Sequence, residues 1–193
     1  MNQKSSREHP TIACCGIDCG LCPQHYSAGQ SRCPGCGGED FSLHHPSCSI
    51  LTCCAKKNKF QTCADCGQFP CAKMAEWDAA DSFVSHKNSL ANLRAIRKEG
   101  ITCYVEAQKQ RVAWLEKVLT DYDDGRSKSF FCLAATFLSM PELTASRREA
   151  DDRSTSQGLD SSDKKGKAKI LKELLQKRAG EEHVELKMRK LPA

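Results

Sequence analysis

The stretch CCGIDCGLCP, residues 14–23, places four cysteines within ten residues and ends on a proline. Thiols in such a cluster can form disulfides, hold a metal ion, carry an iron–sulfur cluster or perform redox chemistry. Each of these uses needs partners elsewhere in the chain. The other cysteines therefore decide how this stretch folds and what it is for.

Most of the other cysteines lie close to this stretch. The chain has 193 residues and 14 cysteines; twelve fall between Cys14 and Cys71, and Cys103 and Cys132 lie beyond. A segment this short and this rich in cysteine has few apolar residues for a core. Such segments are usually held together by disulfides or by metal.

The sequence favours metal over disulfides. The first residues, MNQKSSREHPTIACC (1–15), contain no long apolar run of the kind found in an export signal. No stretch approaches the roughly 20 apolar residues of a membrane span. We therefore expect a cytoplasmic chain with no membrane association. In the cytoplasm thiols are kept reduced, and a dense cysteine pattern is typical of metal binding.

The composition predicts five segments in a mainly α fold with little β structure. They are a flexible N-terminus (1–11), an irregular cysteine-rich module stapled by metal (12–71), a helical unit packed on it (72–150), a disordered linker (151–167) and a charged tail with a short amphipathic helix (168–193). The helical unit is predicted from apolar residues that recur at three and four positions: Leu90, Leu93 and Ile96 before a helix stop at Gly100, and Val112, Leu115 and Leu119 after it. The apolar run 129–140 predicts a further helix, which Pro141 should close.

Ten cysteines have spacings typical of metal ligands. They form the groups Cys15-x3-Cys19-x2-Cys22, Cys33-x2-Cys36, Cys48-x4-Cys53 and Cys63-x2-Cys66-x4-Cys71. A C-x2-C pair suits one metal because its tight turn aims both sulfurs at a point about 2.3 Å away. Three such pairs between residues 19 and 66 are a strong signal, so we predict that these ten cysteines are the ligands.

The predicted metal is zinc, with a [4Fe–4S] cluster as the alternative. Four cysteine thiolates form a standard structural zinc site, and the ten cysteines exceed the eight that two such sites require, so two zinc ions are expected. Iron–sulfur clusters are also commonly held by four cysteines. The Cys15-x3-Cys19-x2-Cys22 triplet has the spacing of radical S-adenosylmethionine enzymes, but the chain lacks the length and the alternating strand–helix pattern of their barrel.

Two groupings of the ligands are compatible with these spacings. The favoured one closes a short loop at low entropic cost. It assigns one site to Cys33, Cys36, Cys48 and Cys53, and the other to Cys15, Cys19, Cys22 and the Cys63–Cys71 group. The competing arrangement pairs Cys33 and Cys36 with Cys63 and Cys66.

The motifs resemble a known family. CCGIDCGLCP, CPGC (33–36), CSILTCCA (48–55), CADCGQFPC (63–71) and YDDGRSKSFFCLAATFL (122–138) are similar to cysteine-rich proteins of anaerobic bacteria and archaea that are known only as a domain of unknown function. The resemblance spans roughly residues 12–140 and matches all ten cysteines. Cys54 stands where the family usually has alanine, and Cys14 is also additional, so either can replace a neighbour as ligand. The resemblance implies a metal-binding module followed by helices, and it implies no reaction.

Other candidate residues have ordinary explanations. His25, His44 or His45 can complete a site of three cysteines and a histidine, although cysteines are already in excess. The turn DDGRSKS (123–129) offers amides and basic side chains to an anion, but capping of the next helix explains the same residues. Cys132 lies in an apolar run, where cysteine is usually a small buried hydrophobe.

These observations predict a non-catalytic metalloprotein whose zinc ions are structural and which binds a protein partner. We find no nucleophile–base pairing and no nucleotide-binding glycine motif. The net charge of +5 includes a tail of mixed sign, so nucleic acid is not an expected partner. The alternative is an iron–sulfur protein that acts in electron transfer, in metallocofactor assembly or in enzyme activation. Nothing in the sequence indicates the identity of the partner or the oligomeric state.

Overall fold

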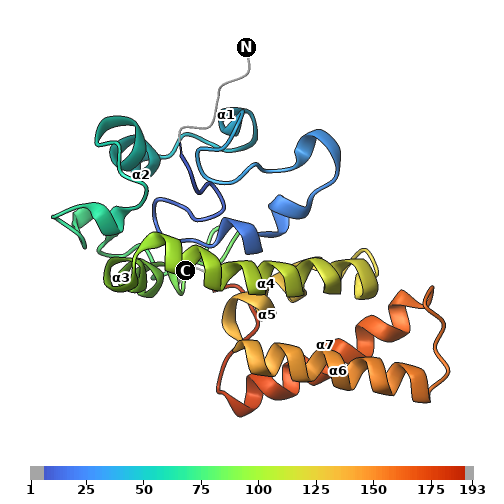
Figure 1. The fold of residues 1–193 in the computed structure, drawn as a ribbon. Helices are drawn as coiled ribbons and strands as arrows, with labels where there is room; N and C mark the ends of the chain where they lie inside the picture. The colour runs from blue at the N-terminus through green and yellow to red at the C-terminus, as the bar shows by residue number, and fades with distance from the viewer. Residues whose placement is uncertain (1–6, 190–193) are drawn as a thin grey trace. The chain divides into compact units, whose positions relative to one another are not determined.

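The computed structural model describes residues 7–189, which fall into two compact units (Figure 1). One unit holds the residues up to Gln108 together with Met188 and Arg189, and the other is Lys109–Lys187. Within the described residues there are seven α-helices, and the β structure is a single antiparallel bridge between Ile12 and Asp18. The prediction of a mainly α fold with an irregular cysteine-rich N-terminal region is confirmed.

The first unit is rich in glycine, proline and cysteine, and it contains short helical turns joined by irregular segments. In chain order they are η1 (Cys19–Leu21), η2 (Pro23–Tyr26), η3 (Gly29–Ser31), α1 (Phe41–His44), α2 (Ser49–Leu51), the π-helix η4 (Thr52–Lys57), η5 (Cys63–Asp65) and η6 (Ala72–Met74). The longer helix α3 (Ser89–Glu99) follows, and α4 (Ile101–Tyr122) begins in this unit and continues into the next. Gly100 separates them with a φ of 87°, as the predicted helix stop requires.

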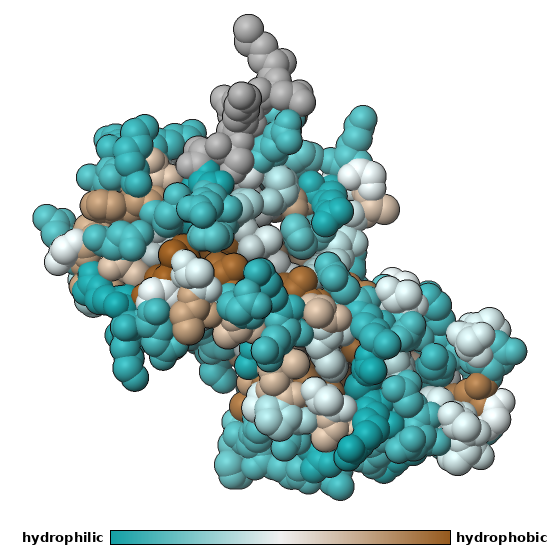
Figure 2. Space-filling model, viewed as in Figure 1, coloured by the Kyte–Doolittle hydropathy of each residue, from teal (hydrophilic) through white to brown (hydrophobic). Residues whose placement is uncertain are grey.

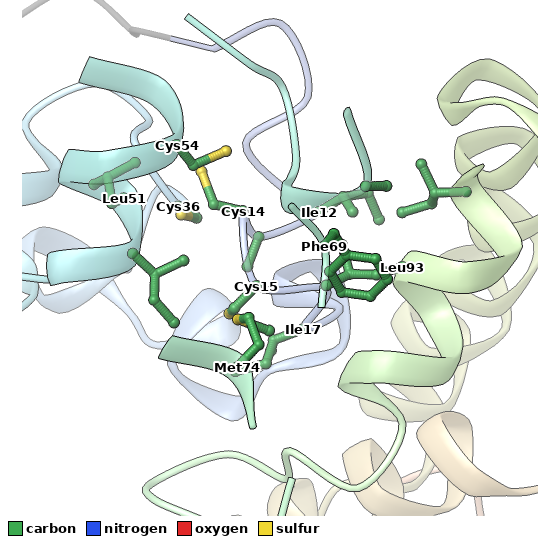
Figure 3. Packing of buried hydrophobic residues seen from close by; sticks show 14 of the residues in the cluster. Ile12, Cys14, Cys15, Ile17, Cys36, Leu51, Cys54, Phe69, Met74 and Leu93 are labelled. Atoms are coloured by element: carbon green, nitrogen blue, oxygen red, sulfur yellow. The ribbon is translucent and has the colours of Figure 1, made fainter. Parts of the chain in front are cut away.

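The core of the first unit mixes aliphatic side chains with cysteines (Figure 3). Leu90, Leu93 and Ile96 of α3 are buried, as their spacing predicted. They pack in one cluster with the buried cysteines Cys14, Cys15, Cys36 and Cys54. The cysteine-rich segment therefore depends on α3 for part of its apolar core.

The loop that contains CCGIDC is fixed by α3 and α4. Gly16 has a φ of 86°, and a Cβ there would lie 2.3 Å from the Ser89 carbonyl oxygen, so this position requires glycine. The Ser89 hydroxyl donates to the Cys15 carbonyl oxygen at 2.8 Å. The Tyr104 hydroxyl donates to Asp18 Oδ1 at 2.9 Å. These contacts set the direction in which Cys15 and the turn after it project.

Four helices form the second unit: the later part of α4, α5 (Lys128–Phe137), α6 (Met140–Ser156) and α7 (Lys164–Glu181). Its core contains side chains with no exposed surface, among them Leu115, Val118, Tyr122, Phe131, Leu143 and Leu171. The face of the molecule seen in Figure 2 is mainly hydrophilic, with apolar residues in separate patches. In residues 7–189 no helix combines the length and the apolar character needed to cross a membrane.

The segment boundaries differ from the predicted ones. Residues 72–108 belong to the same unit as the cysteine-rich segment. The linker predicted over 151–167 is largely helical, because α6 continues to Ser156 and α7 begins at Lys164, where the Asp163 carboxylate accepts from the Gly166 amide at 2.8 Å. In the tail helix Ile170, Leu171, Leu174 and Leu175 are buried, and α7 packs on α6. Parts of the flexible N-terminus and of the tail, 1–6 and 190–193, lie outside the described residues.

Candidate functional site

The ten predicted ligands line two separate pockets of the first unit. The large pocket has a volume of about 330 Å³ and is lined by Cys15, Cys19, Cys22, Cys33, Cys36 and Cys48. The small pocket, of about 40 Å³, is lined by Cys53, Cys63, Cys66 and Cys71, and also by Cys54. The fold therefore gathers cysteines that lie up to 33 residues apart in the sequence, as from Cys15 to Cys48.

Local turns place the cysteines of the large pocket. Cys19 and Cys22 stand at either end of η1, where the Cys22 amide donates to the Cys19 carbonyl oxygen at 3.1 Å. In the CPGC turn Gly35 has a φ of 89°, and a Cβ there would lie 2.4 Å from the Pro10 carbonyl oxygen. The Cys36 amide donates to that same oxygen at 2.8 Å. Small residues inside the C-x2-C turns thus let the backbone approach closely behind the sulfurs.

The remaining wall of the large pocket is apolar and aromatic. Its lining includes Phe41, His45, Trp77, Phe83, Val84 and His86. His45 stacks on Phe41 with ring centroids 4.7 Å apart, and His86 stacks on Trp77 at the same separation. His45 is thus the one of the three predicted histidines that lines this pocket.

His86 is a pocket residue that the sequence did not indicate. Its ring is buried, with Nε2 2.9 Å from the Ser82 hydroxyl and Nδ1 3.1 Å from the Trp77 carbonyl oxygen. Burial lowers its pKa, which favours the neutral imidazole. Ser82 and His86 are four residues apart but lie outside a regular helix, so no periodic pattern marked them.

The wall between Trp77 and His86 is held by a buried carboxylate. The Asp81 side chain is 1% exposed and pairs with Arg189, whose Nη2 lies 2.8 Å from Oδ1. Burial alone would raise the pKa of Asp81, but hydrogen bonds from the Arg189 side chain and amide, the His86 amide and the Ser85 hydroxyl outweigh it and hold this pKa at about 2. The C-terminal end of the described chain thereby fixes one side of the large pocket.

This carboxylate predicts a pH dependence of stability. Because the folded pKa lies below the unfolded value of about 3.9, its contribution is fully present above pH 4 and is lost as pH falls through about 2. We expect the free energy of unfolding to fall by about 1–2 kcal/mol over this pH window, after allowance for solvent screening. Urea unfolding of wild type and Asp81→Asn at pH 2 to 5 measures it. If the free energy of unfolding changes with pH equally in both proteins, the assignment to Asp81 is wrong. Arg189→Ala, which removes the partner of this carboxylate, should reduce the pH dependence.

The small pocket is built around the CADCGQFPC segment. Thr62 caps η5: its hydroxyl accepts from the Ala64 amide at 3.2 Å, and its amide donates to Asp65 Oδ2 at 2.9 Å. From α3, Arg97 donates to the carbonyl oxygens of Ala64 and Phe69, at 3.0 and 3.1 Å, and also to that of Cys66. One arginine therefore fixes the turn between Cys63 and Cys71 through three backbone carbonyl groups.

A chain of sulfur contacts lies at the boundary of the two pockets. The Cys14 thiol interacts with those of Cys36 and Cys54, and the Cys54 thiol also interacts with that of Cys63. Figure 3 shows the sulfurs of Cys14, Cys36 and Cys54 gathered together. Cys36 belongs to the large pocket and Cys63 to the small one. The two pockets are thus connected through Cys14 and Cys54.

The environment divides these thiols into two electrostatic classes. Hydrogen bonds from neighbouring thiols lower the pKa of Cys14 and of Cys63, whereas donating those bonds raises the pKa of Cys36 and of Cys54. Burial raises the pKa of Cys15 to about 12. The buried Arg7, whose Nη1 donates to the Cys36 carbonyl oxygen at 3.0 Å, adds a positive charge that favours the thiolate of Cys14.

The pockets divide the cysteines differently from both predicted groupings. Cys48 caps the start of α2 and lines the large pocket, whereas Cys53 lies in the following π-helix and lines the small one. Cys33 and Cys36 are likewise separated from Cys63 and Cys66. All fourteen cysteines are free thiols. Over residues 7–189, no three Cys, His, Asp or Glu side chains converge as they do around a bound metal ion.

The other sequence candidates have structural roles. In the DDGRSKS turn the amides of Gly125 and Arg126 donate to the carboxylates of Asp123 and Asp124, at 3.1 and 3.0 Å. These amides are therefore already bonded within the turn. The predicted cap of the next helix is not formed, because Ser127, the N-cap residue of α5, makes no side-chain cap hydrogen bond. Cys132 is buried, as its apolar surroundings indicated.

Comparison with known proteins identifies the segment that forms the two pockets. Residues 11–76 match the family described as Protein of unknown function (DUF3795). The match confirms the resemblance, although it ends at residue 76, well before the predicted end near residue 140. No match was found among curated proteins or among solved structures. The cysteine-rich part of this chain, residues 11–76, is thus the part that matches the DUF3795 domain of unknown function.

Proposed function

We propose that the cysteine-rich domain binds metal through the two groups of thiols that line its pockets. The observation that carries this proposal is the distribution of the ten spaced cysteines, every one of which lines one of the two pockets. Cysteines distributed without a function would not be expected to gather in this way. The sulfurs are not in ligand positions in this structure, so binding requires them to close on the ion.

The small pocket fits a single zinc ion. Cys53, Cys63, Cys66 and Cys71 supply the four thiolates of a structural zinc site, and Cys54 is left over. A water needs about 10–15 Å³ of the same kind of volume, so about 40 Å³ suits one ion rather than a larger group. Zinc bound here would supply folding free energy, on the order of 10 kcal/mol, to a segment with few aliphatic residues.

The large pocket favours a different occupant. Six cysteines exceed the four ligands of one zinc, and about 330 Å³ is more than twice the roughly 150 Å³ of a cavity that holds benzene. A [4Fe–4S] cluster held by four of these thiolates fits this donor set. The apolar wall would limit the access of water to a cluster and influence its potential. The second candidate function is therefore electron transfer or assistance in metallocofactor assembly or enzyme activation.

A protein partner and a reducing compartment complete the proposal. Phe83 is half exposed and also lines the large pocket, so a partner that exchanges electrons with this pocket would be expected to contact it. The fourteen free thiols are suited to a compartment that keeps cysteines reduced, such as the cytoplasm.

Metal analysis of single variants tests both parts of the proposal. Protein purified without oxygen is assayed for zinc, iron and acid-labile sulfide, and its visible absorption is recorded. We expect Cys66→Ser to lower zinc by about one ion per chain while iron and colour remain. We expect Cys22→Ser to lower iron, sulfide and colour while zinc remains. Cys103→Ser, at an exposed position in α4, is the matched control and should change neither.

Two results would contradict the proposal. A wild-type protein without zinc, iron or sulfide would refute metal binding altogether. Zinc at two ions per chain without iron would restore the simpler prediction of two zinc sites and remove the redox candidate.

A further inference from the structure

We infer that Met188 and Arg189, at the C-terminal end of the first unit, form a strap that holds the large pocket closed and opens it on release. The strap is attached to the pocket wall 78–86, a segment without regular secondary structure. This wall supplies Ser82, Phe83, Val84 and His86 to the lining of the pocket. The inference concerns access to the pocket, so it goes beyond the proposed function and does not depend on metal.

Arg189 anchors the wall through both its backbone and its side chain. The Asp81 amide donates to the Arg189 carbonyl oxygen at 3.2 Å, and the Arg189 amide donates to Asp81 Oδ2 at 2.7 Å. The Arg189 side chain donates from Nη2 to Asp81 Oδ1 at 2.8 Å.

The wall has no comparable anchor elsewhere. Within residues 7–189, the hydrogen bonds that join residues 78–85 to parts of the chain outside 74–89 are all made with Arg189. The other attachments of the wall are apolar: Phe83 lies edge-on to His45 with ring centroids 5.2 Å apart, and Val84 packs against the core. Such contacts have little directionality and can slide, so the position of the wall depends on Arg189.

The burial of Asp81 couples the strap to the position of the wall. Its carboxylate is 1% exposed, whereas the Arg189 side chain is 33% exposed and is reached from solvent. On release Oδ2 loses both groups that donate to it, the Arg189 amide and Nε, and Oδ1 keeps the Ser85 hydroxyl and the His86 amide. A buried carboxylate without its cation is costly, so Asp81 would turn toward water and draw the wall away from the pocket.

The strap thereby controls which molecules reach the thiols of the large pocket. Cys15 and Cys22 line this pocket and are buried. The pocket, at about 330 Å³, has room for a group much larger than water. A fixed wall hinders the passage of such a group, and a displaced wall admits it. Release of Arg189 is therefore the step at which a large group enters or leaves.

Thiol labelling of the purified full chain tests the inference. Each protein is treated with a bulky fluorescein maleimide, and the labelling rate of each cysteine is followed by site-resolved peptide mass spectrometry. Arg189→Ala removes the side-chain bonds, and Arg189→Pro also removes the amide that donates to Asp81. We expect Arg189→Pro to raise the rate at Cys22 about tenfold or more, and Arg189→Ala to raise it less, because charge-assisted bonds are lost in steps.

Three controls separate the strap from general loosening of the domain. The rate at Cys54, a buried thiol that lines the small pocket, should stay at its wild-type value in every variant. Arg189→Lys keeps the charge but not the planar fork, so its rate at Cys22 should lie between those of wild type and Arg189→Ala. Lys187→Ala removes a neighbouring positive charge, which pairs with Glu185 at 3.1 Å, and should label as wild type does.

Two results would overturn the inference. If Arg189→Pro labels Cys22 at the wild-type rate, the strap does not control access. If Cys54 accelerates as much as Cys22, the variant loosens the whole domain and no single pocket has been opened. Where Arg189→Pro fails to fold, Arg189→Ala decides by the same two criteria. A protein that contains no metal yet shows the expected pattern would refute the proposed function and support this inference.

Discussion

Chelation under reducing conditions is expected to abolish amide protection across the cysteine-rich domain. Between residues 12 and 71, few large aliphatic or aromatic side chains are buried, chiefly Ile12, Ile17, Ile50, Leu51 and Phe69. Cysteines fill much of the remaining core, and a thiol contributes less than a leucine or phenylalanine. Metal at two sites would add on the order of 10 kcal/mol each, which is more than the whole stability of many domains.

Three amides are suitable probes for this experiment. Those of Gly20, Cys36 and Cys63 donate to the carbonyl oxygens of Thr11, Pro10 and Cys14, at 3.0, 2.8 and 2.8 Å, and so report contacts between separate segments. Hydrogen exchange is followed before and after treatment with a strong chelator and a thiol reductant, with the loss of metal verified. Exchange at the three probes should accelerate by several orders of magnitude.

The internal control is the second unit. The amides of α6 and α7 should keep their protection, because this unit contains no proposed ligand and has its own apolar core. If the three probes remain protected after the metal has gone, the apolar cluster around Leu93 is sufficient and metal has no structural role. Protection lost in both units would mean that the chelator acts on the whole chain.

The helices with large apolar residues could be predicted from the sequence. The residues over 89–99 and 101–122 form α3 and α4, and the run 129–140 includes all of α5 except its first residue. The identity of the buried residues and the exact ends of the helices depended on packing against other elements. The stripe predicted on α4 included Val112 and Leu119, which are only partly buried, whereas Trp114 and Val118 are buried. Pro141 does not follow a helix end as a stop; it lies in the first turn of α6, a position where its missing amide is not needed.

The helix α6 was missed because its buried face is made of small residues. Ser146, Ala150 and Ser154 follow Leu143 at three- and four-residue intervals and are buried. Small polar residues give no hydrophobic period, so the sequence does not indicate this helix within the predicted helical unit, and its last residues, 151–156, fall in the predicted linker. They are buried because α7 packs closely against them with its own leucines and alanines.

The ten cysteines singled out by their spacing all line the two pockets, but the way they are divided between the pockets could not be predicted. Spacing identifies C-x2-C turns because both sulfurs belong to one local structure. It does not indicate which turns meet, since that depends on distant contacts such as Tyr104 to Asp18 and Arg97 to the turn after Cys63. Cys48 and Cys53 are near in sequence, but Cys48 precedes α2 as its cap, Cys53 lies in the π-helix after α2, and the two line different pockets.

Replacement of Leu115 by aspartate is expected to be the most damaging single change in the second unit. Leu115 has no exposed surface, and its α4 neighbours are bonded to other helices or to the turns between them. The Trp114 indole donates to the Leu143 carbonyl oxygen at 3.0 Å, and Arg111 donates to those of Ala135 and Leu138 at 2.8 and 2.6 Å. The positive group one turn earlier in the helix, Arg111, already donates to these two carbonyl oxygens. A carboxylate at position 115 would therefore be buried at a cost of about 3–5 kcal/mol, including the lost packing.

Denaturant unfolding of the full chain measures this loss, and two variants calibrate it. Leu115→Met keeps the volume and should cost less than about 1.5 kcal/mol. Glu116→Gln changes a charge on the exposed face of the same turn and should stay within about 0.5 kcal/mol. If Leu115→Asp unfolds within error of Glu116→Gln, the assigned buried face of α4 is wrong. If the metal content of the Leu115→Asp protein equals that of wild type while α5–α7 lose amide protection, the cysteine-rich domain folds independently of the helical unit, and the metal sites belong to the first unit alone.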